Sequence, residues 1–284
     1  MNAWYVGVPW AEAALLLAAA VLLPLAWPLI VVRRDEDARA AALLRIARRV
    51  RLPAAVFLTA AFFLPPGAAA AALSLPWAVF AGLCGTAGML RLRRDVRQSA
   101  AESALDLGLL YMAGGAAWAV ISRLGLRPMQ FEPIIVLLTA VHFHYAGFLL
   151  PLLSAAACRA APGIWSRFAA LGSVAGVPLL AAGFAFSPPL ELAAALLITA
   201  ASVALAAVQL RLALRGRNPA ALWLLTLSAV SLLSGMALAG AYAWGEYSGR
   251  RFLDIPSMLP LHGAVNGLGF ALCGLLGWRQ MERS

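Results

Sequence analysis

Long runs of apolar residues, separated by short polar segments, dominate this chain. The runs lie at approximately 10–32, 53–73, 75–92, 103–123, 133–157, 165–187, 190–214, 219–244 and 258–278. A helix needs about 20 consecutive apolar residues to cross the hydrocarbon core of a bilayer. The pattern therefore predicts an all-α fold, a polytopic transmembrane helix bundle with about nine spans.

The second run is the weakest because Pro65, Pro66 and Gly67 interrupt it. Eight spans with one broken or re-entrant segment is therefore the alternative count. Non-helical backbone at membrane depth is tolerated only where protein or water covers it.

The composition excludes a water-soluble enzyme, a disordered chain and a disulfide scaffold. Of the 284 residues, 63% are hydrophobic and only 12% are charged, whereas a soluble domain is about 25% charged. The three cysteines are scattered and form no CxxC motif. No second soluble domain is visible, so residues 1–284 are expected to form a single transmembrane domain.

All 22 basic residues are arginine, and the net charge is +10. With nine spans and the N-terminus outside, the segments expected in the cytoplasm contain every arginine except Arg123, Arg127, Arg250 and Arg251. This bias follows the positive-inside rule and predicts a cytoplasmic C-terminus. Arginines placed in this way favour membrane lipids, including anionic ones, as partners and argue against nucleic acid.

The basic cytoplasmic segment 33–52 connects the first two runs. Its central part, 35–50, fits an amphipathic helix with Ala41, Leu44, Ile46 and Val50 on the apolar side, so that its arginines would reach lipid phosphates. A charged connector that only sets the topology explains the same residues equally well.

The three histidines, His142, His144 and His262, all lie inside apolar runs. Ionisable residues inside a membrane are costly and usually face a partner or a cavity, so each histidine is a candidate functional residue. The fifth and ninth runs both start at the outer surface in the predicted topology, which places the histidines in the outer half of the membrane.

The spacing of His142 and His144 restricts their roles. Residues two apart in a regular helix point about 200° away from each other. One of the two is therefore expected to face a cavity and the other to pack against a neighbouring helix, unless a π-bulge intervenes.

Three further residues complete the candidate catalytic set: Tyr145, Asn266 and Glu132. In an enzyme, His142 or His144 would have the acid–base role, and Tyr145 and Asn266 would orient the substrate by hydrogen bonds. Glu132 could pair with a histidine. In the alternative interpretation, Glu132 is a charge favoured by the helix dipole and the histidines are hydrogen-bonded links between helices. Gly263 and Gly267 predict a close helix contact beside His262.

The run HFHYAGFLLP at 142–151, together with HGAVNGLGF at 262–270, resembles the YndJ-like family of bacterial integral membrane proteins. The resemblance covers most of the chain. It implies a multi-pass protein of the bacterial cytoplasmic (inner) membrane and supports the choice of site residues without implying a particular reaction.

Three functions fit these residues. The first is a membrane-embedded enzyme, of isomerase, cyclase or hydrolase type, that performs acid–base chemistry on an apolar small molecule, lipid or isoprenoid-like substrate. The second is a proton-coupled small-molecule transporter. The third is a haem or metal protein with ligands from His142, His144 and His262. The sequence leaves the cofactor and the oligomeric state open.

Overall fold

The computed structural model describes residues 4–30, 37–94, 98–250 and 253–281, and every regular element in those ranges is a helix. Contacts between Cα atoms divide the chain into two compact units, Met1–Leu149 and Leu150–Ser284. The expectation of a single domain stays a prediction.

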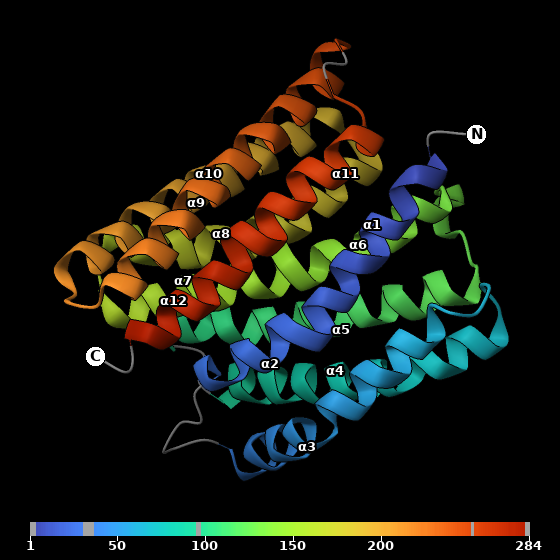
Figure 1. Ribbon diagram of the computed structural model, residues 1–284, viewed down its shortest axis with the longest axis horizontal. Helices are drawn as coiled ribbons and strands as arrows, with labels where there is room; N and C mark the ends of the chain where they lie inside the picture. The colour runs from blue at the N-terminus through green and yellow to red at the C-terminus, as the bar shows by residue number, and fades with distance from the viewer. Residues whose placement is uncertain (1–3, 31–36, 95–97, 251–252, 282–284) are drawn as a thin grey trace. The chain divides into compact units, whose positions relative to one another are not determined.

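The first unit begins with a helix that changes its hydrogen-bond pattern along its length. It consists of α1 (Trp4–Leu17), the π-helix η1 (Ala18–Leu22), α2 (Leu23–Ala26) and the 3-10 helix η2 (Trp27–Leu29). The elements that follow are α3 (Ala38–Ala61), α4 (Ala68–Arg94), α5 (Ala100–Leu124), the 3-10 helix η3 (Pro128–Gln130), α6 (Pro133–His144) and the π-helix η4 (Tyr145–Leu149). Helix α4 packs against α3 and α5 (Figure 1).

The second unit starts within the same continuous helix that carries α6 and η4. Its elements are α7 (Leu150–Ala160), α8 (Ile164–Phe186), α9 (Pro188–Arg215), α10 (Pro219–Ser248), α11 (Ile255–Ala264), the π-helix η5 (Val265–Leu272) and α12 (Cys273–Met281). Helix α9 packs against α8 and α10, and α10 also packs along η5 and α12 (Figure 1).

Eight helical stretches in the described ranges are long and apolar enough to cross a membrane. They are Pro9–Leu29, Ala68–Arg94, Ala100–Leu124, Pro133–Ala160, Ile164–Phe186, Pro188–Arg215, Pro219–Ser248 and Ile255–Met281. The predicted polytopic helical bundle is confirmed, and these eight helices are its candidate spans. The sides of the membrane on which the termini lie stay predictions.

The run 53–73 is broken, as its Pro65, Pro66 and Gly67 suggested, and does not form a span of its own. Helix α3 ends at Ala61, and α4 begins only at Ala68. Pro65 and Pro66 lie in the break, where a proline has no N–H for the helical ladder and its ring crowds the preceding turn. The apolar residues on the two sides of the break therefore belong to two different helices.

The basic connector and the first part of that run form one helix. Residues 33–36 of the predicted connector 33–52 lie outside the described ranges. Helix α3 then starts at Ala38 and continues to Ala61 without interruption at Pro53. Its basic first half keeps it outside the set of eight candidate spans.

Short polar side chains mark the starts of several helices. Each accepts a hydrogen bond from a backbone N–H of the first turn, which would otherwise lack a partner. These N-cap residues are Asp37 for α3, Ser99 for α5, Ser187 for α9, Asn218 for α10 and Asp254 for α11.

Glycines let the backbones of α4 and α5 approach each other closely. A Cβ atom at Gly85 would lie 2.8 Å from Cβ of Ala113, and one at Gly88 would meet the carbonyl oxygen of Asp106 directly. Small residues at a helix contact are typical of membrane proteins, where van der Waals packing replaces the hydrophobic effect.

We expect Gly88→Ala to destabilise the first unit, because the added methyl group would overlap the backbone of Asp106. Overpacking of this kind typically costs about 1–3 kcal/mol. Gly82→Ala on the same helix is the matched control, since its Cβ would enter open space. Thermal unfolding of the detergent-purified variants checks this, and equal melting temperatures for the two variants would contradict it.

Candidate functional site

His144 is buried, with 1% of its surface exposed. Its Nδ1 lies 2.8 Å from the carbonyl oxygen of Ala140, and its Nε2 lies 3.1 Å from Nε1 of Trp77. A carbonyl oxygen can only accept and an indole N–H can only donate. These contacts therefore hold His144 in the neutral form that carries its proton on Nδ1.

Two other helices of the first unit, α4 and α5, pack against this histidine. Trp77 comes from α4, and its ring is stacked on the imidazole with centroids 5.8 Å apart. Gly115 comes from α5, where a Cβ atom would lie only 2.9 Å from Nδ1 of His144. Because both ring nitrogens are engaged by the protein, this geometry suits a link between helices better than proton exchange with a substrate.

His142 points to a different side of α6. Its ring is exposed, and its Nδ1 lies 2.8 Å from the carbonyl oxygen of Leu138, one turn earlier in the same helix. The two histidines thus have separate surroundings, as their spacing in a regular helix predicts. The π-helix η4 begins only after His144, so it does not bring their rings to one face.

Tyr145 and Glu132 are not brought to the imidazole rings. The Tyr145 hydroxyl donates to the carbonyl oxygen of Ala14 in α1, at 2.9 Å. Glu132 precedes α6 and pairs with Arg127 at 2.8 Å, with both side chains about half exposed. Ten residues of helix separate Glu132 from His142, about 15 Å along the axis.

His262 and Asn266 form a polar contact with α10 in the second unit. Nδ1 of half-buried His262 lies 3.0 Å from the carbonyl oxygen of Gly235, and Nδ2 of Asn266 donates to the carbonyl oxygen of His262 at 2.9 Å. Gly235 makes this contact possible, because a Cβ atom there would overlap the Asn266 amide. The proton of His262 is therefore on Nδ1, and Nε2 carries the lone pair.

An eight-residue π-helix, η5, starts three residues after His262 and contains Asn266. π-Helical segments are rare and occur frequently at functional sites. The His262 segment thus combines an intramembrane histidine, a polar partner and an irregular backbone.

Of the two glycines that the sequence suggested for a close helix contact beside His262, Gly263 makes none. A Cβ atom at Gly263 would meet nothing within 4 Å. Gly269 instead lies against Ser231, and Gly274 lies against Ser228, whose hydroxyl would be 2.8 Å from a Cβ atom there. Ser228 also donates to the carbonyl oxygen of Phe270 at 2.9 Å.

Asp254 lies just before this span and caps α11. Its Oδ1 accepts the backbone N–H of Ser257 at 2.9 Å. Hydrogen bonds from the Ser257 side chain and then its backbone lower the pKa of Asp254. Asp254 is therefore ionised at neutral pH, and its carboxylate acts as the N-cap of α11.

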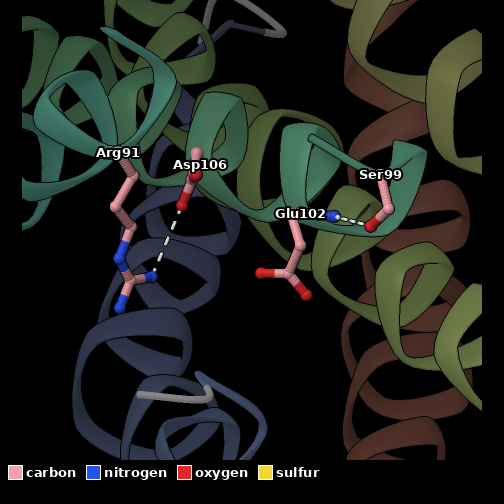
Figure 2. A network of polar contacts seen from close by, with 4 residues as sticks. All are labelled: Arg91, Ser99, Glu102 and Asp106. Carbon is pink, nitrogen blue, oxygen red and sulfur yellow. Dashed lines mark hydrogen bonds and ion pairs between the residues drawn. The ribbon is translucent and has the colours of Figure 1, made fainter. Parts of the chain in front are cut away.

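A buried ion pair joins α4 and α5 in the first unit. Nη1 of Arg91 lies 3.4 Å from Oδ1 of Asp106, and the two side chains are 2% and 0% exposed. Figure 2 shows this pair, with Ser99 accepting the backbone N–H of Glu102 at 3.3 Å nearby. Removing one partner of a buried pair leaves an uncompensated charge, at a cost of about 3–5 kcal/mol.

This pair was not predicted from the sequence, where Arg91 was interpreted only as a topology-setting charge. Opposite charges on the two sides of a short connection between antiparallel helices are the signal that could have identified it. Gly88 contributes as well, since it lets the Asp106 backbone approach α4.

Arg123 also has a structural role that was not expected of an outer-loop charge. It is buried in the last turn of α5, where Nη2 donates to the carbonyl oxygen of Leu64 at 2.8 Å. Its guanidinium lies 4.6 Å from the centroid of the Phe62 ring and 3.8 Å from the carboxylate of Glu12. Arg123 thus holds the connection between α3 and α4 and reaches α1.

The described part of the chain contains no cluster of three or more His, Cys, Asp or Glu side chains able to hold a metal ion. His142 and His144 belong to the first unit, and His262 belongs to the second. The predicted catalytic and metal-binding roles of these residues stay predictions.

A family model described as "YndJ-like protein" matches residues 13–270. The chain belongs to the YndJ-like family. With its eight candidate spans, it is a multi-pass protein of the bacterial inner membrane.

A relative in this family is the "Uncharacterized membrane protein YndJ" of Bacillus subtilis (strain 168), which is 32% identical over 216 residues. The match covers 72% of this chain and 38% of the relative, so the chain spans well under half of that protein's length. No solved structure matches the chain.

The hydrogen bond between Trp77 and His144 should appear as a coupling between the two residues. In a double-mutant cycle with Trp77→Phe and His144→Phe, we expect a coupling energy of about 1 kcal/mol, beyond the packing lost at each site. Thermal or denaturant unfolding of the four proteins measures it. Strictly additive effects would show that the contact contributes nothing to stability.

Gly235→Ala should displace Asn266 and loosen the contact of α10 with the last span. We expect a loss of about 1–3 kcal/mol, typical of overpacking, and a change in the NMR signals of the His262 ring. Gly240→Ala on the same helix is the control, because its Cβ would meet nothing within 4 Å. If both variants behave like the unmodified protein, the close approach at Gly235 is refuted.

Proposed function

We propose that this chain is part of a membrane-embedded enzyme in which His262 acts as a general base on an apolar or lipid-like substrate. The observation that carries the proposal is the hydrogen bond from Nδ1 of His262 to the carbonyl oxygen of Gly235, at 3.0 Å. It fixes the orientation of the ring and its tautomer, with the proton on Nδ1. A base held in this way is a common arrangement in acid–base catalysis.

The reaction class follows from what a neutral imidazole can do. Nε2 takes a proton from a substrate carbon and returns it at another position, as in an isomerisation or cyclisation, or it takes a proton from water, as in a hydrolysis. Asn266 lies one turn after His262. Its amide donates to the His262 carbonyl oxygen and lies where a Cβ atom on Gly235 would stand. It positions the His262 backbone against α10.

The surroundings of His262 favour an apolar substrate. The span Ile255–Met281 is long and apolar enough to lie in the hydrocarbon core, and much of its first part is only half buried in the protein. A lipid or isoprenoid-like molecule already dissolved in the bilayer can approach such a surface without crossing water.

Lipid analysis of cells tests this proposal. A strain that lacks the gene is complemented with the unmodified protein, with His262→Gln or with Ser234→Ala, and total lipids are compared by mass spectrometry. We expect His262→Gln to leave the lipid change of the deletion uncorrected, although it reaches the membrane in normal amount. Ser234→Ala is the control, because this exposed hydroxyl bonds only to the carbonyl oxygen of Val230 in its own helix. Full correction by His262→Gln would overturn the proposal.

A proton-coupled transporter is the second candidate, and the Arg91–Asp106 pair favours it. Charged groups buried inside membrane spans often mark ion or proton pathways, and both side chains are almost completely inaccessible. Proton flux into proteoliposomes, followed with a trapped pH dye, separates the two functions. Transport predicts a flux that Asp106→Asn abolishes and His262→Gln does not, whereas the enzyme predicts no such flux.

The haem or metal class receives less support from the geometry. Coordination by His144 requires the loss of its contact with Trp77 or Ala140, because each ring nitrogen already has a protein partner.

A further inference from the structure

Helix α3 differs from the other long helices because its two halves have opposite character. From Arg39 to Arg51 it carries five arginines and no acidic residue, and from Pro53 to Ala61 it carries no charge. It is also the long helix in the described ranges that does not qualify as a candidate span. A helix of this kind is expected at a membrane interface, with its basic half at the headgroups.

The orientation of α3 is set by its contact with α4. The buried residues of α3 are small or apolar: Ala40, Leu44, Ala47, Ala54, Ala55, Leu58 and Ala61. Arg51 also turns toward the protein, where its guanidinium lies 5.5 Å from the centroid of the Trp27 ring. The opposite face of α3 therefore points outward along the whole helix.

That outward face carries charge first and apolar side chains afterwards. Arg45, Arg49, Leu52 and Val56 are all exposed and follow the spacing i, i+4, i+7 and i+11, which places them on one stripe. Arg48 is exposed beside them. From Arg45 to Val56 the stripe covers about 17 Å of helix, a length that spans headgroup and upper acyl-chain depth.

The start of α3 lies at a basic end of the hairpin that it forms with α4. The break at 62–67 reverses the chain, so that α3 and α4 lie side by side in opposite directions (Figure 1). The last turn of α4 therefore lies near the first turns of α3. Arg93 and Arg94 in that turn are also exposed. Their charges add to the positive potential around the arginines of α3.

We propose that Arg45, Arg48 and Arg49 form a binding surface for the headgroup phosphate of an anionic phospholipid, whose acyl chains lie along Leu52 and Val56. Arginine recognises phosphate through several N–H donors at once, and basic clusters next to a membrane attract anionic lipids. Leu52 and Val56, the apolar end of the stripe, favour a lipid over a free phosphate ion, because only a lipid has acyl chains that can cover these two side chains. This surface is independent of the His262 site.

Binding of dioleoyl phosphatidylglycerol to the detergent-purified chain tests the proposal, with native mass spectrometry as the readout. We expect the triple variant Arg45→Gln, Arg48→Gln and Arg49→Gln to bind this lipid on the order of 100-fold more weakly, from the attraction of each arginine to an anionic lipid. Replacement of the same three residues by lysine should restore much of the affinity. Because all three side chains are exposed, the melting temperature in lipid-free detergent should not change.

Two comparisons decide between this surface and its alternatives. Arg211→Gln, Arg215→Gln and Arg217→Gln remove the same charge from exposed positions in the last turns of α9 and just after it, and they should leave lipid binding unchanged. The double variant Leu52→Ser and Val56→Ser should weaken binding of the lipid without changing the charge of the protein. An equal loss in both arginine triplets, or displacement of the lipid by millimolar inorganic phosphate alone, would overturn the proposal.

Discussion

Polar groups buried between these helices have little water to bind, so they depend on partners inside the protein. An unsatisfied polar group in an apolar environment costs several kcal/mol. Backbone carbonyls supply many of the partners: that of Ala14 accepts from Tyr145, that of Gly235 from His262 and that of Phe270 from Ser228. The buried hydroxyls of Ser154 and Ser202 are exceptions, with no hydrogen-bond partner among the residues that the structure describes.

This requirement explains why glycines and polar residues occur together at the helix contacts. A side chain reaches a carbonyl of the neighbouring helix only where the two backbones come close, and a missing Cβ atom permits that approach. Gly235 stands against Asn266, Gly115 against His144 and Gly88 against the backbone of Asp106. The polar contacts and the close packing are thus two consequences of the same small residues.

The same requirement separates the histidines by what each can do. Both ring nitrogens of His144 are hydrogen-bonded, one to Trp77 of α4 and one to Ala140 of its own helix α6, so the ring links the two helices. His262 is held through Nδ1 and is only half buried, beside a long π-helical segment. The same sequence pattern, a histidine inside an apolar run, therefore corresponds to two different environments. The proposed chemistry rests on that of His262.

The sequence by itself determined the approximate limits of eight apolar runs and the break at Pro65 and Pro66, because hydropathy, helix length and proline geometry act locally along the chain. It also predicted that His142 and His144 point apart, since helical periodicity is a local property as well. It did not show that the residues of the run 53–73 belong to two different helices. Only the tertiary structure decided that Trp77 binds His144 from 67 positions away and that Arg91 meets Asp106. Partners of that kind depend on which helices pack together and at what depth, and neither quantity is encoded in the periodicity of a single run.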